Sequence, residues 1–196
     1  MTDADDMDLS VLRKDIIAKR RALSVDKRLE LSDTIAGRLF ETDEYKNADT
    51  VLIYADYNGE VATDRIINRC FLDGKAVYAP VCGKDCDLEF YRIYALDEME
   101  PGAYGIREPL TIEYLKLSDK DISDKSICIT PGSVFDRHCN RCGYGKGYYD
   151  RFFADTPIGI RIGLAYDFQI TEDITVKDTD IAMTMIITEN ETINGK

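Results

Sequence analysis

Hydrophobic and polar positions follow two different periods along the chain, and the longer period predicts helices. From Leu9 to Leu23 apolar residues recur at helical spacing, and Ser24 can cap a second helix from Val25 to about Phe40. A third helix is expected from about Thr63 to Phe71, and a fourth opens near Tyr148. In the second helix the positions expected to be buried are Leu29, Leu31, Ile35 and Leu39.

Short apolar runs between these helices predict strands. Val51–Ala55 and Ala76–Val81 are continuous apolar runs, as is typical of strands buried on both faces, whereas Leu88–Tyr94 alternates like a strand with one wet face. Helices that alternate with β-branched strands predict an α/β fold, a three-layer α/β/α domain with a mostly parallel sheet. The remaining strands are expected at Ser126–Thr130, Ile158–Tyr166 and Met183–Thr188.

The order of these elements also predicts where a ligand binds. In open parallel sheets, ligands lie beyond the carboxyl ends of the strands. Asn58–Glu60 follows the first expected strand, and the glycine-rich segment of residues 131–153 follows Ser126–Thr130. We therefore expect both segments to border one site. Without an internal repeat or a low-complexity linker, residues 1–196 are expected to form a single domain.

Charge and cysteine content narrow the function classes. With 25 basic and 37 acidic residues the net charge is −12, which opposes non-specific nucleic-acid binding but not a small anion in a locally basic pocket. No apolar run is long enough to span a membrane, and the acidic start MTDADDMDLS resembles neither a secretory signal nor a transit peptide. Six cysteines then indicate free thiols in a reducing cytoplasm.

The segment PGSVFDRHCNRCGYGKGYYDRFF, residues 131–153, carries most of the functional signal. Its alternating glycines let backbone N–H groups approach an anion, and the helix expected from Tyr148 would direct its N-terminus at the same anion. Arg141, Lys146 and Arg151 add full charges, and Asp150 could hold the divalent cation of a polyphosphate. The spacing matches neither the Walker A nor the dinucleotide fingerprint, so a glycine-rich surface turn stays an alternative.

Other side chains support competing interpretations. Asp150 could simply stabilise a helix N-terminus, and its best metal-binding partner is Asp178, followed by Asp180. The sole histidine, His138, fits a solvated loop better than a general base. Four cysteines have spacings that a zinc-stabilised interaction module would accept, namely Cys82, Cys86, Cys139 and Cys142.

Taken in order, these pieces make a longer pattern. The hallmark PG..FD..G.RLG.G.GYYD is matched by Pro131–Gly132, Phe135–Asp136 and Arg141–Asp150, with the glycine before the arginine and the leucine after it replaced by Cys139 and Cys142. Flanking matches are Leu12–Arg13, Arg20–Ser24, Glu60–Thr63, Gly105–Pro109, Gln169 and Asp178. In this the chain resembles the 5-formyltetrahydrofolate cyclo-ligases, or methenyltetrahydrofolate synthetases. It departs from them at Leu9, where the family usually has a lysine, and at Ala62, where it has an acid.

The resemblance implies a Rossmann-like fold of the CoA-transferase type and a reaction. Such an enzyme converts 5-formyltetrahydrofolate to 5,10-methenyltetrahydrofolate with ATP as co-substrate and Mg²⁺ as cofactor. By matching positions, catalysis would fall to Lys146, Arg141 and Tyr149, and the metal to Asp150 and Asp178. The folate would contact Arg13, Ala55, Glu60, Tyr148 and Tyr149. ATP would contact Arg13, Arg141, Cys142, Gly143, Tyr144, Gly145, Lys146, Gly147, Tyr148 and Tyr149.

Two rival functions and a set of partners complete the expectations. Another ATP- or sugar-phosphate-binding enzyme of the same fold class is the first rival, because one fold hosts many reactions. The zinc-stabilised module is the second. The expected partners are small molecules, without nucleic acid or membrane, for a monomer or weak homo-oligomer.

Overall fold

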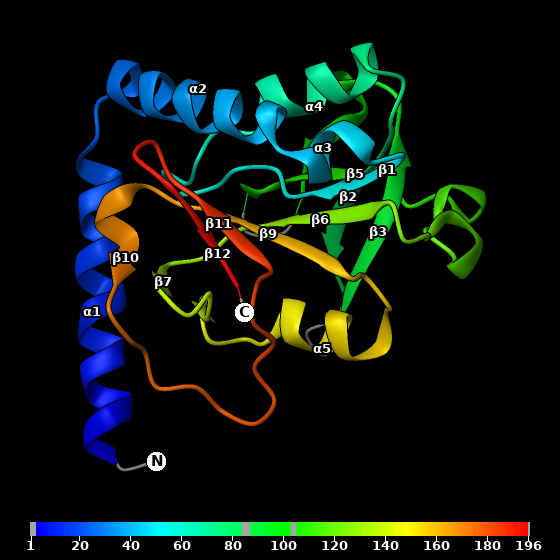
Figure 1. The fold of residues 1–196 in the computed structure, drawn as a ribbon. Helices are drawn as coiled ribbons and strands as arrows, with labels where there is room; N and C mark the ends of the chain where they lie inside the picture. The colour runs from blue at the N-terminus through cyan, green and yellow to red at the C-terminus, as the bar shows by residue number, and fades with distance from the viewer. Residues whose placement is uncertain (1–2, 84–86, 103–104, 196) are drawn as a thin grey trace.

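The computed structural model describes residues 3–83, 87–102 and 105–195, and within them a seven-stranded sheet forms the middle layer (Figure 1). Its strands are β1 (Thr50–Ile53), β2 (Ala76–Cys82), β3 (Leu88–Ile93), β6 (Ser126–Thr130), β9 (Ile160–Leu164), β11 (Met185–Ile187) and β12 (Thr192–Asn194). They lie in the order β12-β11-β9-β6-β1-β2-β3. Neighbours from β11 to β2 pair in parallel, and only the edge strands β12 and β3 pair antiparallel. The mostly parallel sheet predicted from the sequence is confirmed.

Helices cover both faces of this sheet. On one face lie α2 (Val25–Glu41), α3 (Asp43–Asn47) and α4 (Asp64–Leu72), and on the other lies α5 (Tyr148–Asp155) (Figure 1). The long helix α1 (Asp3–Ala22) runs along one side of the molecule, past the ends of the layers. Two small sheets join β10 (Ile170–Thr171), β7 (Val134–Asp136) and β8 (Arg141–Cys142), and β4 (Met99–Pro101) with β5 (Arg107–Pro109). Short 3₁₀ turns lie at Leu96–Glu98, Glu113–Leu115, Asp119–Asp121 and Asp167–Gln169.

Local sequence signals explain where α2 begins and which face it buries. The Ser24 side chain accepts a hydrogen bond from the backbone N–H of Lys27 at 3.2 Å, which satisfies a donor at the helix start. Ile35 and Leu39 are fully buried, as expected, and Leu31 is partly buried. The expectation for Leu29 was wrong: this side chain is 46% exposed, because the face it occupies has no partner element among the described residues.

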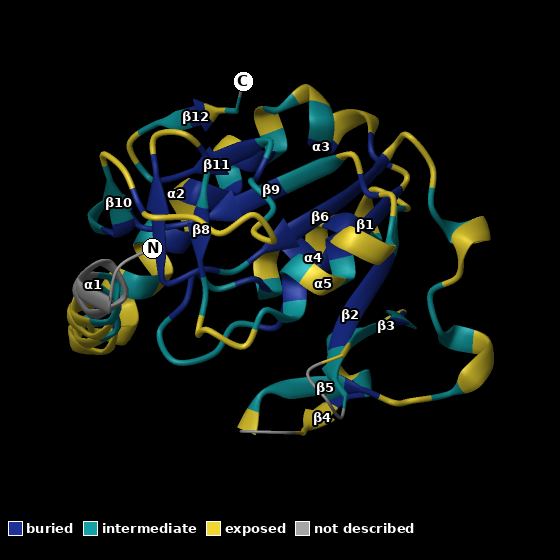
Figure 2. Cartoon of the chain, turned by 90° about the horizontal axis from the view of Figure 1, so that it is seen from below, coloured by how far each residue is buried: buried dark blue, intermediate teal, exposed yellow. Residues whose placement is uncertain are grey.

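Most of the sheet is buried (Figure 2), and clusters of apolar side chains pack on both of its faces. β1 and β6 are buried along their whole length, which explains the apolar residues on both faces of each strand between their polar ends. Phe135 of β7 packs on the sheet where Gly163 leaves room, since a Cβ there would come within 2.6 Å of the ring. No helix in the described ranges has the length and apolar character needed to cross a bilayer.

Candidate active site

A cavity of about 860 Å³ lies where the strands β1, β2 and β6 end. Its walls come from α1, from the segments that follow β1 and β6, from α5, and from residues 174–181, which cross in front of it. Every site residue implied by the family resemblance lines this cavity: Arg13, Ala55, Glu60, Arg141, Cys142, Gly143, Tyr144, Gly145, Lys146, Gly147, Tyr148, Tyr149, Asp150 and Asp178. Residues more than 150 positions apart in the chain are thus brought together, while their individual roles stay predictions.

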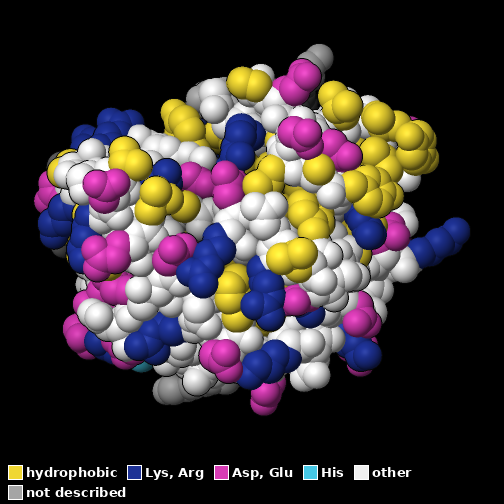
Figure 3. All heavy atoms as spheres, turned by 90° about the horizontal axis from the view of Figure 1, so that it is seen from above, with side chains coloured by type: hydrophobic (Ala, Val, Ile, Leu, Met, Phe, Trp, Pro, Cys, Tyr) yellow, Lys and Arg dark blue, Asp and Glu magenta, His cyan; other side chains and the backbone are white. Residues whose placement is uncertain are grey.

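A second hollow, of about 780 Å³, lies over α2 and α4 on the face seen in Figure 3. Basic and acidic side chains alternate on that face, and the arginines around the hollow are engaged with carboxylates. The pairs are Arg28 with Asp56, Arg65 with Asp33, Arg69 with Asp73, and Arg107 with Asp64. We therefore place the anion site in the first cavity.

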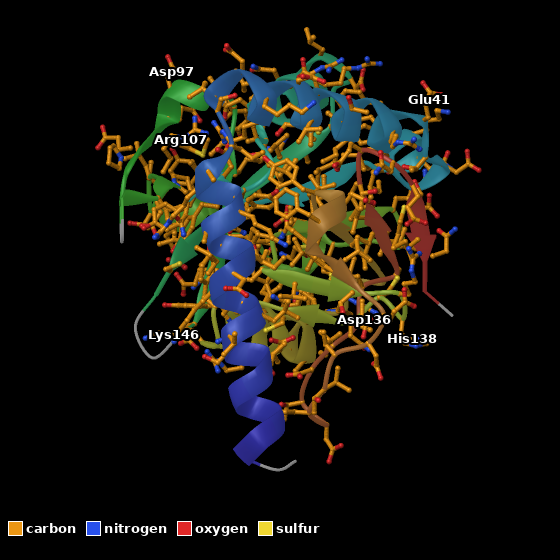
Figure 4. All side chains as sticks on the ribbon, turned by 90° about the vertical axis from the view of Figure 1, so that its left-hand side faces the viewer. Glu41, Asp97, Arg107, Asp136, His138 and Lys146 are labelled. Atoms are coloured by element: carbon orange, nitrogen blue, oxygen red, sulfur yellow. The ribbon has the colours of Figure 1, made fainter. Side chains whose placement is uncertain are left out.

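The glycine loop, residues 143–147, connects β8 to α5 at the mouth of the cavity. Gly145 and Gly147 have φ of +85° and +67°, values that side chains rarely adopt, and Gly147 is the residue that caps α5. The exposed Lys146 also lines the cavity, and in Figure 4 it lies on the opposite side of α1 from His138. The loop therefore presents backbone N–H groups, a helix start and an ammonium group to the same space.

Arg141 is nearly buried and forms the inner wall. Its Nη2 donates to Oδ1 of Asp150 at 3.0 Å, and its guanidinium lies 5.4 Å from the centre of the Tyr149 ring. Its Nε is buried and has no hydrogen-bond partner within the described part of the chain. Asp150 Oδ1 also accepts from the backbone N–H of Ile181 at 3.3 Å, which holds α5 against the segment that carries Asp178.

Tyr149 is buried beside this ion pair. Burial raises the pKa of its phenol well above the ordinary value of 10, so the hydroxyl stays protonated at neutral pH. Its ring packs against Phe90 and Phe153, with centroids 6.5 and 5.9 Å away. Tyr149 can therefore donate a hydrogen bond to a ligand, but it cannot act as a base.

The metal site at Asp150 and Asp178 stays a prediction. Asp150 and Asp178 line the same cavity, yet no group of three or more His, Cys, Asp or Glu side chains forms a metal site within the described residues. Magnesium commonly binds through one or two carboxylates, with phosphate oxygens and water as its other ligands. With Asp150 and Asp178 on one cavity, a magnesium site there would need the phosphate oxygens of a nucleotide to complete it.

Glu60 lies on the other wall of the cavity and is only 4% exposed. Its Oε2 accepts from the backbone N–H of Tyr57 at 3.0 Å, and its Oε1 accepts from the Tyr144 hydroxyl at 3.2 Å. Burial raises the pKa of this carboxyl to about 7, and the nearby Arg20 guanidinium, 3.8 Å away, opposes part of that rise. Glu60 is thus a buried acceptor that titrates near neutrality.

Arg20 is the residue that the sequence interpretation missed. The sequence places Arg20 in the first helix and assigns it no role in the site, but its side chain is only 1% exposed. Its guanidinium donates to the carbonyl oxygens of Gly132 and Asn58 at 3.1 and 3.2 Å and to the Tyr144 hydroxyl at 2.5 Å. A usable signal existed, because Arg20 continues the helical stripe of Leu9, Arg13 and Ile16, all of which face inward.

Comparison with known proteins decides the family. Residues 6–189 match the model of the 5-formyltetrahydrofolate cyclo-ligase family. The chain belongs to the 5-formyltetrahydrofolate cyclo-ligase family. It is therefore an enzyme, and the resemblance drawn from its motifs is confirmed.

Relatives match over most of their length. The 5-formyltetrahydrofolate cyclo-ligase of Escherichia coli K12 is 28% identical over 184 residues, which cover 88% of this chain and 96% of that protein. A Caenorhabditis elegans protein named "Probable 5-formyltetrahydrofolate cyclo-ligase" is 28% identical over 183 residues, which cover 87% of each chain. The solution structure of Aquifex aeolicus 5,10-methenyltetrahydrofolate synthetase has a TM-score of 0.80 and 30% identity, covering 94% of this chain and 91% of that one. The fold class is shared.

Leu9 is one of the positions at which this chain departs from the cyclo-ligase pattern. Leu9 lines the cavity and packs with Ile16 and Cys142, so an apolar wall stands where the family usually has a lysine. Arg13 lies beside it, with Nη2 3.1 Å from the Cys142 sulfur. The Arg13 guanidinium also lies 3.6 Å from where a Cβ of Gly145 would be, so Arg13 is a cation of α1 that lies beside the backbone of the glycine loop.

Neither the zinc interpretation nor a catalytic His138 is supported by this cyclo-ligase structure. Cys139 is fully buried in the core, where burial raises the pKa of its thiol to about 11, whereas Cys142 belongs to a different apolar cluster beside α1. Among the described residues, no group of three or more His, Cys, Asp or Glu side chains could hold a metal ion. Cys86 lies outside the described residues. His138 is exposed and does not line the cavity, so the solvated-loop interpretation is confirmed.

We expect Glu60→Gln to change how the stability of the unliganded protein depends on pH. Because the pKa of Glu60 is raised to about 7 in the folded chain, its protonated form contributes stability below about pH 4.5, and this contribution is lost as the pH rises through 7. The variant lacks this titration. Urea unfolding between pH 5 and 8 should show the wild type losing more stability than the variant. Identical pH dependence for both would contradict the assignment.

Proposed function

We propose that this cavity binds ATP and 5-formyltetrahydrofolate side by side and catalyses the ATP-dependent closure of the folate to 5,10-methenyltetrahydrofolate, with release of ADP and phosphate. The observation that carries the proposal is that a cationic glycine loop and a buried carboxylate, Glu60, line one cavity and meet there through the Tyr144 hydroxyl. The loop suits a triphosphate, and the carboxylate suits the donor edge of an aminopyrimidinone.

The chemistry explains why a nucleotide is needed. A formamide reacts poorly for two reasons. Amide resonance makes its carbon a weak electrophile, and its oxygen would have to leave as hydroxide, which is a poor leaving group. Transfer of the γ-phosphoryl group to this oxygen gives an iminium-like phosphate. N10 then attacks the formyl carbon and loses its proton. The carbon–oxygen bond breaks, and the phosphate leaves with the former formyl oxygen. Positioning and charge neutralisation account for most phosphoryl-transfer catalysis, so no covalent protein nucleophile is required.

The basic residues of the cavity have distinct proposed roles on the nucleotide side. Backbone N–H groups of the glycine loop and the side chain of Lys146 hold the phosphates, and Lys146 offsets the charge that builds on the transferring group. The orphaned Nε of Arg141 offers a buried donor to the same phosphates, while its Nη2 remains on Asp150. Arg13 is the cation that α1 adds to this wall.

The folate side and the metal complete the proposed site. Glu60, Ala55 and the two tyrosines Tyr148 and Tyr149 border the space left for the pterin. Asp150 and Asp178 would hold magnesium together with phosphate oxygens, and the ion would supply neutralisation of phosphate charge. Asp150 would do so through Oδ2, because its hydrogen bonds with Arg141 and with the Ile181 backbone use Oδ1.

The test of this function mixes the purified protein with MgATP and 5-formyltetrahydrofolate and follows the near-ultraviolet absorbance of the methenyl product. We expect absorbance to rise only with ATP present, with one ADP and one phosphate formed per product, and to stop when EDTA removes the metal. The absence of an ATP-dependent rise would contradict the proposal. ADP formation without product would favour the rival ATP-binding enzyme.

The setting of the enzyme is part of the proposal. The five cysteines among the described residues are free thiols, which fits a reducing compartment such as the cytoplasm. We propose that the protein acts as a monomer or weak homo-oligomer on small-molecule substrates, without nucleic acid or membrane as a partner.

A further inference from the structure

Tyr144 connects the two walls of the cavity. It belongs to the glycine loop, but its hydroxyl donates to Oε1 of Glu60 at 3.2 Å and accepts from Nη2 of Arg20 at 2.5 Å. Its ring lies 5.8 Å from the Arg20 guanidinium carbon. These are contacts between the proposed phosphate loop and the proposed folate carboxylate, made by one side chain.

Tyr144 is not part of the cyclo-ligase hallmark. In the hallmark pattern G.G.GYYD the position of Tyr144 is open, so the loop can form its glycine turns with other residues there. Tyr144 also remains 44% exposed, so packing does not require a phenol at this place. Its hydroxyl contacts, rather than its bulk, therefore define what it can do.

We propose that Tyr144 is a positioning residue that couples nucleotide binding at the glycine loop to folate recognition at Glu60. The inference rests on the proposed function, because it needs both ligands to bind in this cavity. A triphosphate that fixes the loop also fixes the hydrogen bond from the Tyr144 hydroxyl to Glu60. That hydrogen bond orients the carboxylate and favours its ionised form before the pterin binds. By thermodynamic reciprocity, bound folate strengthens nucleotide binding by the same factor.

The direction of the hydrogen bonds supports this coupling. A guanidinium only donates, so the Tyr144 oxygen must accept from Arg20, and its single proton is then free to go to Glu60. A hydrogen bond donated to a carboxylate favours its charged form, which is the form that accepts from an aminopyrimidinone. Removing the Tyr144 hydroxyl therefore leaves the Glu60 carboxyl in place but makes its charged form less favourable.

The pH dependence follows from all groups around Glu60. The pKa of Glu60 is raised to about 7 by burial and by the charge of Asp56, and it is held down by Arg20, by the Tyr57 backbone and by Tyr144. Without the Tyr144 hydroxyl one lowering influence is lost, so the pKa rises further. Other groups that face Glu60 or its backbone are Tyr54 of the segment after β1, Arg28 of α2, Tyr149 of α5 and Tyr166 after β9.

The test compares wild type with Tyr144→Phe by calorimetric titration of 5-formyltetrahydrofolate, with and without a saturating non-hydrolysable MgATP analogue. In the wild type, the analogue should tighten folate binding at least about fivefold. In Tyr144→Phe this factor should fall below about twofold, and the pH at which folate binding is half-maximal should move upward. Tyr114→Phe, at a side chain 83% exposed and outside the cavity, is the matched control.

Each outcome bears on one of the two proposals. Equal coupling and equal pH profiles in Tyr144→Phe and wild type would overturn the role of Tyr144, as would a wild type that cyclises the folate but binds the two ligands independently. A wild type that fails to cyclise the folate overturns the proposed function itself, and this inference with it. Thermal unfolding of Tyr144→Phe should match wild type, which excludes a folding defect as the cause.

Discussion

Lys146→Ala is expected to lower kcat for ATP-dependent cyclisation by about 10²–10³-fold. The ammonium group stands on the glycine loop at the cavity, where it would face the charge that builds on the transferring phosphoryl group. Because Lys146 is exposed and packs into no core cluster of the described residues, its removal should leave the fold unchanged. Steady-state rates at saturating MgATP and folate measure the effect.

The control for this variant is Lys120→Ala, which removes an exposed ammonium group outside the cavity. Its kcat should match that of the wild type. If Lys146 acts in the transition state, kcat and kcat/KM for ATP fall together, whereas a rise in KM alone would assign it to ground-state nucleotide binding. Unchanged turnover at saturating MgATP would remove Lys146 from the mechanism.

Arg20→Met is expected to have the largest effect on stability, lowering the free energy of unfolding by about 3 kcal/mol at pH 8. The substitution keeps an unbranched, apolar stem but removes the buried charge beside Glu60 and the donor to the carbonyl oxygen of Asn58. The carbonyl of Gly132 keeps its second donor, Nε2 of Gln169 at 2.9 Å. Urea unfolding followed by circular dichroism measures the loss.

Arg21→Met is the matched control, because Arg21 is the neighbouring arginine of α1 but is exposed to solvent. Its loss should stay within about 0.5 kcal/mol. The deficit of Arg20→Met should shrink at pH 5, because a protonated Glu60 no longer needs a compensating cation. Two results would contradict this. Either equal losses of unfolding free energy in the two variants, or a loss in Arg20→Met that is the same at pH 5 and pH 8, would show that the charge of Arg20 does not compensate that of Glu60.

Much of the architecture follows from local patterns. Val51–Ala55 is continuously apolar because both faces of β1 are covered, and such strands alternating with helices along the chain predict a mostly parallel sheet. Ser24 marks the start of α2 for an equally local reason, since its hydroxyl accepts from the third backbone N–H of the helix. Leu29 breaks the pattern because apolar spacing does not reveal which helix face meets the sheet.

The site was predictable where its chemistry is carried by consecutive residues. Residues 141–150 combine glycines, cations and a carboxylate within one loop and one helix start, so their proximity needs no tertiary information. Arg20 could not be found in this way. An arginine on a helix is ordinarily solvated, and only the meeting of α1 with the Asn58 turn and the glycine loop buries it.

By itself the sequence determined the family, the mostly parallel α/β fold and the cationic glycine loop, because these depend on periodicity and on residues adjacent in the chain. Only the tertiary structure decided that Glu60 is buried with Arg20 and that Tyr144 spans the cavity to meet them. The physical reason is desolvation. Whether a charged side chain lies in water or in the interior depends on elements distant in sequence, and that environment sets both its pKa and its partners.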